Sequence, residues 1–490
     1  MAKKRKIDNT FTITSYQPND CVTSSSIMVE VDGIKILLDL GLMQDSSMTF
    51  PQLYHNNMQK LQSIPYDKLD YVVFSHFHFD HSAAIPILVR EEANFHGTII
   101  ATELTTKLSE LIMYDAQRIN QSEVTIHNNK NDKKKKYRTF YDKEDVANVI
   151  DQIRCYGYCE EIKLSDNVTL ELLPACHASG ASMIYITYTD EFKTRRLLYT
   201  GDITYGHTVD RPFTKRILDK CLKADVVVCE STYGLIDKIT YENENPIDFL
   251  ESVILEEVVH KNQTLWVPSF AIHRATTLYL YLYEIFQRNE EIRKANIPVF
   301  FCGKMMMEAH RIIGKDCYDE YYDEKWHDKK DIFRKDPFGF LIQKKDVEHY
   351  CLNNGRKIVI SSSGMFDKGY SSLLADSYVS NKKVSALACG YQGDGTLGSK
   401  LRDGVEYASV NGISKKVRLS YKGCIPSLSG HANHNGLIEF IKSLNQSVLK
   451  NIVLVHGDDD AKLELKQDLE KELSKNKTIS IIKQFETLKF

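Results

Sequence analysis

The chain has 490 residues, of which 42% are hydrophobic and 26% are charged, and its formal net charge is −3. A single hydrophobic core rarely grows beyond roughly 250–300 residues, so the length predicts more than one domain. The near-neutral charge excludes attraction of nucleic acid by overall positive charge, and a nucleic-acid binder of this composition would need a local basic surface. Two basic clusters, Lys3–Lys6 and Lys133–Lys136 with Arg138, are interpreted first as solvated tail or surface.

Eleven cysteines are scattered along the chain without a Cys-x-x-Cys pair. This pattern suits a reducing compartment better than a disulfide scaffold. No uncharged apolar run approaches the roughly 18 residues that a membrane-spanning helix needs. We therefore expect a soluble protein without a membrane partner, located in the cytoplasm or, in a eukaryote, in the nucleus.

Six short apolar runs share one arrangement. Each has the length and β-branched content of a buried strand, and each leads within a few residues to a carboxylate or an imidazole. In chain order they are 34–38 before Asp39, 71–74 before His76, 168–173 before His177, 196–199 before Asp202, 225–229 before Glu230, and 452–455 before His456. Strand ends hold polar side chains without burying unpaired backbone, so the arrangement predicts a functional site.

The middle of the chain has a different pattern, in which strands alternate with helices. The predicted strands are 266–270, 297–301, 357–361 and 384–390, and the predicted helices are 274–288 and 305–313. Such alternation favours a parallel sheet flanked by helices. The earlier pattern returns near residue 425 and ends in a charged helix over 459–475. We therefore expect a first domain formed by residues 1–234 and 425–490, interrupted by a second domain over 235–424.

The segment His76-Phe77-His78-Phe79-Asp80-His81 carries four ligand-type side chains in six positions. Imidazole is a good zinc ligand, and carboxylate oxygens suit a second, harder site. In an extended strand end His76 and His78 point the same way, whereas Asp80 and His81 turn toward a neighbouring position. The spacing favours two adjacent metal ions over one, and the alternative is a histidine-rich loop without metal.

This run resembles the metal-binding motif of the metallo-β-lactamase superfamily, and the other strand-end residues follow in that family's order. The resemblance implies an α/β fold with an αββα sandwich and two zinc ions, with Mn²⁺ as the alternative metal. It assigns His76, His78 and His177 to one ion, Asp80, His81 and His456 to the second, and Asp202 to both. Asp39 would lie behind the ligands and orient one of them.

Three later segments resemble the motifs of the β-CASP nucleases, in which a second domain is inserted into the first. Glu230 in VVVCESTYG resembles motif A, His431 in SLSGHANHNG motif B, and His456 in NIVLVHGD motif C. The similarity is greatest to the RNA-cleaving branch, that of ribonuclease J and the pre-mRNA 3′-end-processing endonuclease, because the DNA-repair branch carries valine at motif C. Two places depart from the pattern: Asn433 replaces an acid of motif B, and residues 15–26 lack the usual glycine-rich, Glu-containing sequence.

The resemblance implies a zinc-dependent ribonuclease that cleaves RNA internally, from the 5′ end, or both. A hydroxide activated by two metals near Asp202 would attack phosphorus. His431, tuned by Glu230, would protonate the leaving ribose oxygen, so Asp202, Glu230 and His431 are the expected catalytic residues. Alternatively, ESTYG could begin a helix with Glu230 as its N-cap.

Two glycine-containing loops, SSSG and GDGTLG, offer backbone N–H groups near strand ends. Such groups can hold phosphate oxygens, and ordinary strand-to-helix turns are the alternative. The expected phosphate-binding residues are Ser362, Ser363, Gly364, Gly395 and Thr396. The expected partner is single-stranded RNA, with a homo-oligomer or a processing complex beyond it. Three alternatives stay open: a DNA nuclease of the same fold, a metallo-hydrolase of a small ester, and an inactive scaffold.

Overall fold

The computed structural model describes residues 10–45, 47–130, 136–204, 223–235, 245–316, 326, 332–335, 337–390, 392–393, 395–425, 428 and 430–490. The chain divides into two compact units. The first comprises Met1–Gly206, Asp210–Lys238 and Gly430–Phe490, and the second comprises His207–Val209 and Ile239–Ser429. The basic residues Lys3–Lys6 and Lys133–Lys135 lie outside the described residues. Within the described residues, the longest apolar helical stretches fall short of what crossing a membrane requires.

The first unit is built on two seven-stranded sheets. The order in one sheet is β22 (Thr487–Lys489), β1 (Thr12–Ser15), β2 (Ile27–Val31), β3 (Ile34–Leu38), β4 (Tyr71–Val73), β5 (Thr98–Ala101) and β6 (Ile153–Cys155). The order in the other is β21 (Thr478–Ile481), β20 (Asn451–Val455), β11 (Val226–Glu230), β10 (Thr194–Tyr199), β9 (Ser182–Thr189), β8 (Val168–Pro174) and β7 (Ile162–Lys163).

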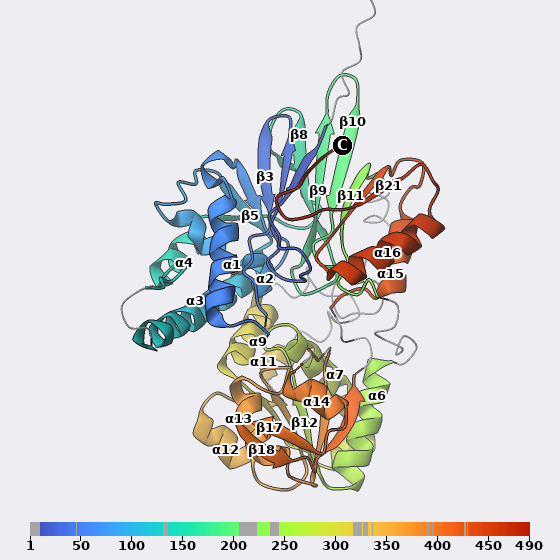
Figure 1. The fold of residues 1–490 in the computed structure, drawn as a ribbon. Coiled ribbons are helices and arrows are strands. Elements are labelled where there is room, and N and C mark those ends of the chain that lie inside the picture. The colour runs from blue at the N-terminus through green and yellow to red at the C-terminus, as the bar shows by residue number, and fades with distance from the viewer. Residues whose placement is uncertain are drawn as a thin grey trace, which may run out of the picture. The chain divides into compact units, whose positions relative to one another are not determined.

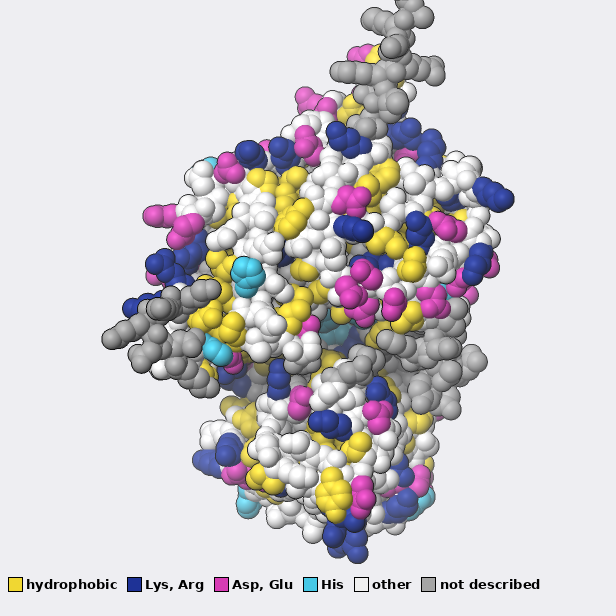
Figure 2. Space-filling view, viewed as in Figure 1, with side chains coloured by type: hydrophobic (Ala, Val, Ile, Leu, Met, Phe, Trp, Pro, Cys, Tyr) yellow, Lys and Arg dark blue, Asp and Glu magenta, His cyan; other side chains and the backbone are white. Residues whose placement is uncertain are grey.

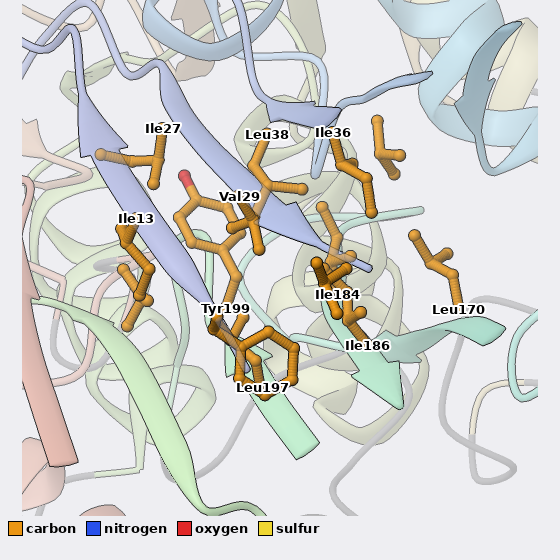
Figure 3. Packing of buried hydrophobic residues seen from close by; sticks show 14 of the residues in the cluster. Ile13, Ile27, Val29, Ile36, Leu38, Leu170, Ile184, Ile186, Leu197 and Tyr199 are labelled. Atoms are coloured by element: carbon orange, nitrogen blue, oxygen red, sulfur yellow. The ribbon is translucent and has the colours of Figure 1, made fainter. Parts of the chain in front are cut away.

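The two sheets pack face to face through an apolar core (Figure 3). In β2 every second residue is buried, which is the period of a strand with one face turned inward. Val29 and Ile36 of the first sheet and Ile184, Ile186 and Leu197 of the second belong to this core. Each such side chain contributes about 1.5–3 kcal/mol when it is fully buried, so this core holds the sheets together.

Helices cover the outer faces of the two sheets (Figure 1). Those beside the first sheet are α1 (Phe50–Ser63), α2 (Phe79–Ser82), α3 (Glu103–Lys130) and α4 (Lys143–Ile150), and those beside the second are α15 (His434–Ser443) and α16 (Asp459–Glu472). A second apolar core joins the first sheet to its helices, with Leu37, Val72 and Ile99 on the sheet and Leu61 and Met113 on helices. The first unit is therefore an αββα sandwich.

The second unit has a six-stranded sheet in which all neighbours are parallel. Its order is β14 (Gly339–Leu341), β13 (Val299–Cys302), β15 (Lys357–Ser361), β12 (Thr264–Pro268), β16 (Val384–Ala388) and β19 (Ser420–Cys424), and β17 (Tyr407–Val410) pairs separately with β18 (Ile413–Lys416). Its helical segments are α6 (Pro246–Val253), the π-helix η4 (Ile254–His260), α7 (Arg274–Arg288), α8 (Glu290–Lys294), α9 (Lys304–Asp316), α11 (Ile332–Lys335), α12 (Lys344–Cys351), α13 (Gly369–Tyr378) and α14 (Leu397–Arg402). The expected parallel sheet flanked by helices is thus confirmed.

Charged side chains of both signs are interspersed on the face of the molecule in Figure 2. This agrees with the near-neutral net charge of −3. On this face, positive charge is not separated from negative charge in a way that would attract a polyanion at long range.

Candidate metal centre

Parallel strands of the first unit bring the polar strand-end residues to one edge. In the second sheet β10, β11 and β20 run parallel, and β8 has the same direction because it pairs antiparallel with β9, which pairs antiparallel with β10. In the first sheet β3 and β4 are parallel. Residues that follow these strands therefore emerge together, and this explains how positions hundreds of residues apart form one cluster.

His76, His78, His177 and Asp202 form the first group of converging donor atoms. Nδ1 of His78 lies 3.0 Å from Nε2 of His76 and 3.0 Å from Nε2 of His177. Tetrahedral zinc with Zn–N distances of about 2.0–2.1 Å separates its nitrogen ligands by about 3.3 Å. The three imidazoles thus have the spacing of metal ligands. Burial holds the pKa of His76 well below its usual range and lowers that of His78 to about 3, so both are neutral, as metal binding requires.

Asp80, His81 and His456 form the second group. Nε2 of His456 lies 3.1 Å from Nε2 of His81 and 3.2 Å from Oδ2 of Asp80. Burial alone would lower the pKa of His81, but Asp202, Asp39 and Asp80 outweigh it and raise this pKa well above its usual range. The surrounding carboxylates therefore attract positive charge to this position.

Asp202 lies between the two groups. Its Oδ2 is 3.5 Å from Nε2 of His76, 3.3 Å from that of His81 and 3.5 Å from that of His177, and its Oδ1 is 3.4 Å from Nδ1 of His456. Both carboxylate oxygens are buried and lack a hydrogen-bond partner among the described residues. A buried carboxylate that accepts no hydrogen bond costs several kcal/mol unless cations neutralise its charge. The donor set therefore fits metal ions, and the cluster is able to bind them.

Neighbouring groups hold the Nδ1 atoms of three of the ligand histidines. His76 Nδ1 lies 3.0 Å from Ser75 Oγ, His177 Nδ1 donates to the carbonyl of Gly430, and His456 Nδ1 lies 3.0 Å from Thr232 Oγ1. Because the hydroxyl of Thr232 donates to Glu230, it accepts from His456. In each ring the proton therefore sits on Nδ1, and Nε2 keeps its lone pair for a metal.

Asp39 is completely buried behind these ligands and accepts four hydrogen bonds. Its Oδ1 accepts from the amide of Ser75 at 2.6 Å, and its Oδ2 accepts from Ser75 Oγ at 2.9 Å, His81 Nδ1 at 2.7 Å and Tyr199 Oη at 2.7 Å. Asp39 thus contacts one ligand directly and a second through Ser75. Ser75, Tyr199 and Thr232, which hydrogen-bond to the site residues, are not among those predicted from the sequence. The only sequence signal for them is their position next to the motifs.

The buried Glu230 and the half-buried His431 form a pair beside Asp202. Glu230 Oε2 accepts from His431 Nδ1 at 2.7 Å, and its Oε1 accepts from the amide of Ile203 at 2.6 Å. Burial alone would lower the pKa of His431, but Glu230 and Asp202 outweigh it and raise the pKa to about 9. Glu230 is the last residue of β11, and a turn follows it, so the alternative in which it begins a helix is wrong.

Two residues near His431 have structural tasks. His434 Nδ1 donates to the carbonyl of Gly234 at 2.6 Å and its Nε2 lies 3.2 Å from Asp468, away from Asp202. Asn433 is the N-cap of α15, and its side chain accepts from the amide of Gly436. Since aspartate caps helices equally well, asparagine at this departure from the usual motif preserves the cap.

The residues expected to bind phosphate lie in the second unit, in two adjacent loops. The amide of Gly398 donates to the carbonyl of Met365, which joins the loop after β15 to the segment containing Gly395 and Thr396. The amide of Ser363 already donates to Lys368, and Thr396 caps α14 by accepting from Ser399. The described structure thus brings Ser362, Ser363, Gly364, Gly395 and Thr396 into one region, where some of their polar groups stabilise the loops themselves.

Three family models match the chain in order along the sequence. They describe a metallo-beta-lactamase superfamily domain over residues 28–221, a Beta-Casp domain over 275–401, and a Zn-dependent metallo-hydrolase RNA specificity domain over 424–480. The chain belongs to the β-CASP family of metallo-β-lactamase-fold proteins. The family and the fold expected from the sequence are confirmed.

Curated relatives match nearly the whole chain at low identity. Integrator complex subunit 11 of Danio rerio is 25% identical over 94% of this chain and 71% of its own length. Endoribonuclease YSH1 of Candida glabrata is 26% identical over 94% of this chain, which spans 56% of that relative's length. An RNase J-like protein of Methanocaldococcus jannaschii is 25% identical over 89% of both chains. The predicted class, metal-dependent nucleases, is confirmed for the family.

Proposed function

We propose that this protein is a zinc-dependent ribonuclease that hydrolyses phosphodiester bonds of single-stranded RNA. The observation that carries the proposal is Asp202, whose buried carboxylate makes no hydrogen bond to the described residues and lies between two groups of metal-type donors. The Glu230–His431 pair beside it supplies a protonated acid. The names endoribonuclease and RNase J-like, carried by relatives that match most of this chain, support RNA as the substrate.

Two metal ions account for the donor set. His76, His78 and His177 would hold one ion, Asp80, His81 and His456 the other, and Asp202 would contact both. Three imidazoles favour zinc, whereas the carboxylates of Asp80 and Asp202 leave Mn²⁺ as the alternative. Metal ions bound in this way supply an acidified water and stabilise negative charge on phosphate oxygens.

The chain's own groups handle the proton that the leaving oxygen needs. A ribose alkoxide is a poor leaving group unless it is protonated as the bond to phosphorus breaks. His431 has a pKa of about 9, so its ring is protonated at neutral pH, and its Nε2 lies 3.9 Å from Asp202. Glu230 holds Nδ1 and thereby directs Nε2 toward the cluster, which makes His431 the proton donor and Glu230 its positioning residue.

The test uses the full chain loaded with zinc and a single-stranded RNA labelled at either end. We expect zinc-dependent cleavage, and the first labelled products will separate internal cutting from removal of nucleotides at the 5′ end. Asp80→Ala and His78→Ala should lose bound metal and cleavage together, whereas His96→Ala, which removes an exposed histidine of the same unit, should change neither. Intact RNA after incubation with metal-loaded protein, or cleavage by the metal-free variants, would refute the proposal. DNA of the same sequence serves as the competing substrate.

A further inference from the structure

Phe270 is exposed in an otherwise well-packed part of the second unit. It follows β12, and 43% of its surface is accessible. The other described phenylalanines of this unit are buried or half-buried. The exposure forgoes the stabilisation of about 1.5–3 kcal/mol that burying such a side chain would bring.

The backbone on both sides of Phe270 is fixed. The amide of Ser269 donates to the carbonyl of Ser361 at 2.8 Å, which continues the pairing of β12 with β15. The amide of Ala275, in the first turn of α7, donates to the carbonyl of Phe270 at 3.3 Å. The ring is therefore presented from a rigid strand-to-helix connection.

Two glycines support the ring from one side. A Cβ atom on Gly364 would lie 3.2 Å from the amide nitrogen of Phe270 and 3.3 Å from two of its ring carbons, and one on Gly390 would lie 4.0 Å from Cε2. Only glycine at position 364 leaves this space without forcing the ring to move. The ring therefore rests on bare backbone at the ends of β15 and β16, while part of its surface stays open.

A buried glutamine ties these two glycines together. Nε2 of Gln392, which is 3% exposed, donates to the carbonyl of Gly364 at 3.2 Å and to the carbonyl of Gly390 at 3.0 Å. The side chain of Gln392 thus holds in place the two glycines on which the Phe270 ring rests. This support includes Gly364, one of the residues expected from the sequence to bind phosphate, so the exposed ring and that loop are neighbours.

We infer that Phe270 is a stacking platform for one base of the single-stranded RNA substrate, an inference that rests on the proposed function. Unpaired bases stack on exposed aromatic rings, and such stacking is tolerant of sequence because every base has a π-face. A ring on a rigid support beside a loop of glycine and serine matches a nucleotide, which carries a flat base one sugar away from its phosphate. Gln392 is the positioning residue for the platform.

The test compares four proteins: wild type, Phe270→Ala, Phe270→Trp and Phe485→Ala. Phe485 provides the matched control, because its exposure is also 43% and it lies in the first unit. Kd for single-stranded RNA is measured by fluorescence anisotropy, and KM and kcat are measured for RNA and for the small diester bis(p-nitrophenyl) phosphate. We expect Phe270→Ala to raise Kd and KM for RNA roughly 5- to 150-fold, the range that follows from the loss of one stacked base. Phe270→Trp and Phe485→Ala should behave like wild type, and small-diester hydrolysis should be unchanged.

Oligonucleotides lacking one base at successive positions identify the contact. If Phe270 stacks on one base, removing that base should weaken binding by the wild type but not by Phe270→Ala, because each change removes the same interaction. Three results would overturn the inference. Phe270→Ala could bind RNA as tightly as wild type, or its loss of affinity could add to that of base removal at every position of the oligonucleotide. Phe270→Ala could also lose as much activity on the small diester as on RNA. Absence of RNA cleavage by the wild type would instead refute the proposed function. In that case the Kd values of wild type and Phe270→Ala for RNA would still show whether Phe270 stacks on a base.

Discussion

Oδ2 of Asp39 accepts a hydrogen bond from Nδ1 of His81 at 2.7 Å, and both side chains are completely buried. The bond leaves Nε2 of His81 free to face Asp202 at 3.3 Å and His456 at 3.1 Å. Asp39 itself, the residue directly after β3, has a left-handed backbone with φ of 61°. The strained backbone of Asp39 thus occurs where its carboxylate has to reach the ligands of the metal cluster.

Replacing Asp39 by asparagine should weaken metal binding. The amide keeps the size of the carboxylate, but it removes the negative charge and replaces one of the two acceptor oxygens by a donor NH2 group. Weakening such a supporting group typically costs 10- to 100-fold in metal affinity. Competition with a chromophoric zinc chelator measures the effect. Tyr199→Phe, which removes only one of the four hydrogen bonds to Asp39, should have a smaller effect, and unchanged zinc affinity in Asp39→Asn would show that the carboxylate does not support the site.

The proton-donor pair predicts a specific pH dependence. His431→Ala should retain bound zinc and lower kcat for RNA by about 10²–10⁴-fold, the usual contribution of a general acid. Because the donor must be protonated, wild-type activity should fall at alkaline pH, where His431, whose pKa the neighbouring Glu230 raises, loses its proton. Glu230→Gln removes the nearest negative charge, so this alkaline limb should move to lower pH. If activity falls at the same alkaline pH in wild type and in Glu230→Gln, His431 is not the proton donor.

Much of this site could be predicted because parallel strands place the residues that follow them at one sheet edge. That rule and the dense run from His76 to His81 identify a cluster without any knowledge of distances. The hydrogen-bond partners could not be predicted in the same way. Tyr199 reaches Asp39 across 160 positions, and such a contact depends on how the two sheets face each other.

The second unit shows a different limit of the sequence. The predicted helix over 274–288 agrees with α7, because its apolar spacing is strongly helical. The predicted strand over 266–270 ends instead at Pro268. One further backbone hydrogen bond, from the amide of Ser269 to the carbonyl of Ser361, continues its pairing before the chain turns. That turn exposes Phe270, which the sequence pattern places within a strand.

An ionic network around the buried Glu257 should make the second unit sensitive to acid. Glu257 of η4 accepts hydrogen bonds from Lys261 at 2.7 Å and Ser385 at 2.6 Å and pairs with Lys422 at 2.5 Å. Burial alone would raise the pKa of Glu257, but the hydrogen bonds from Lys261, Lys422 and Ser385 lower it to about 2. Since the folded-state pKa lies below the ordinary value of 4.5, the stabilisation is complete above pH 4.5 and is lost as the pH falls toward about 2.

Glu257→Gln should therefore reduce the free energy of unfolding by about 2 kcal/mol at pH 7, the scale of hydrogen bonds to a charged group. Denaturant titrations between pH 7 and acid should show the difference from wild type shrinking below pH 4.5. Glu256→Gln is the matched control, because Glu256 is exposed and also pairs with Lys261. A constant difference at every pH would show that Glu257 acts by packing rather than by its charge.

Gly41 is the position where a single methyl group should disturb the metal loop most directly. A Cβ atom there would lie 1.7 Å from the backbone carbonyl oxygen of Asp80 and 2.6 Å from the amide of His81, so the backbone of one loop must shift. The two loops are joined on both sides, since the amide of Leu40 donates to the carbonyl of His81 at 2.8 Å and that of Leu42 to Phe79 at 3.3 Å.

Gly41→Ala should therefore lower the free energy of unfolding by about 3 kcal/mol or more, the upper range for overpacking, and lower zinc affinity in the protein that still folds. Gly393→Ala provides the control, because a Cβ there meets only Thr396 at the ordinary contact distance of 3.8 Å. Thermal unfolding and zinc titration are measured on both variants. A Gly41→Ala protein with wild-type melting temperature and zinc affinity would mean that the loop carrying Asp80 and His81 can move without loss, and that the close approach of these two loops does not set the ligand geometry.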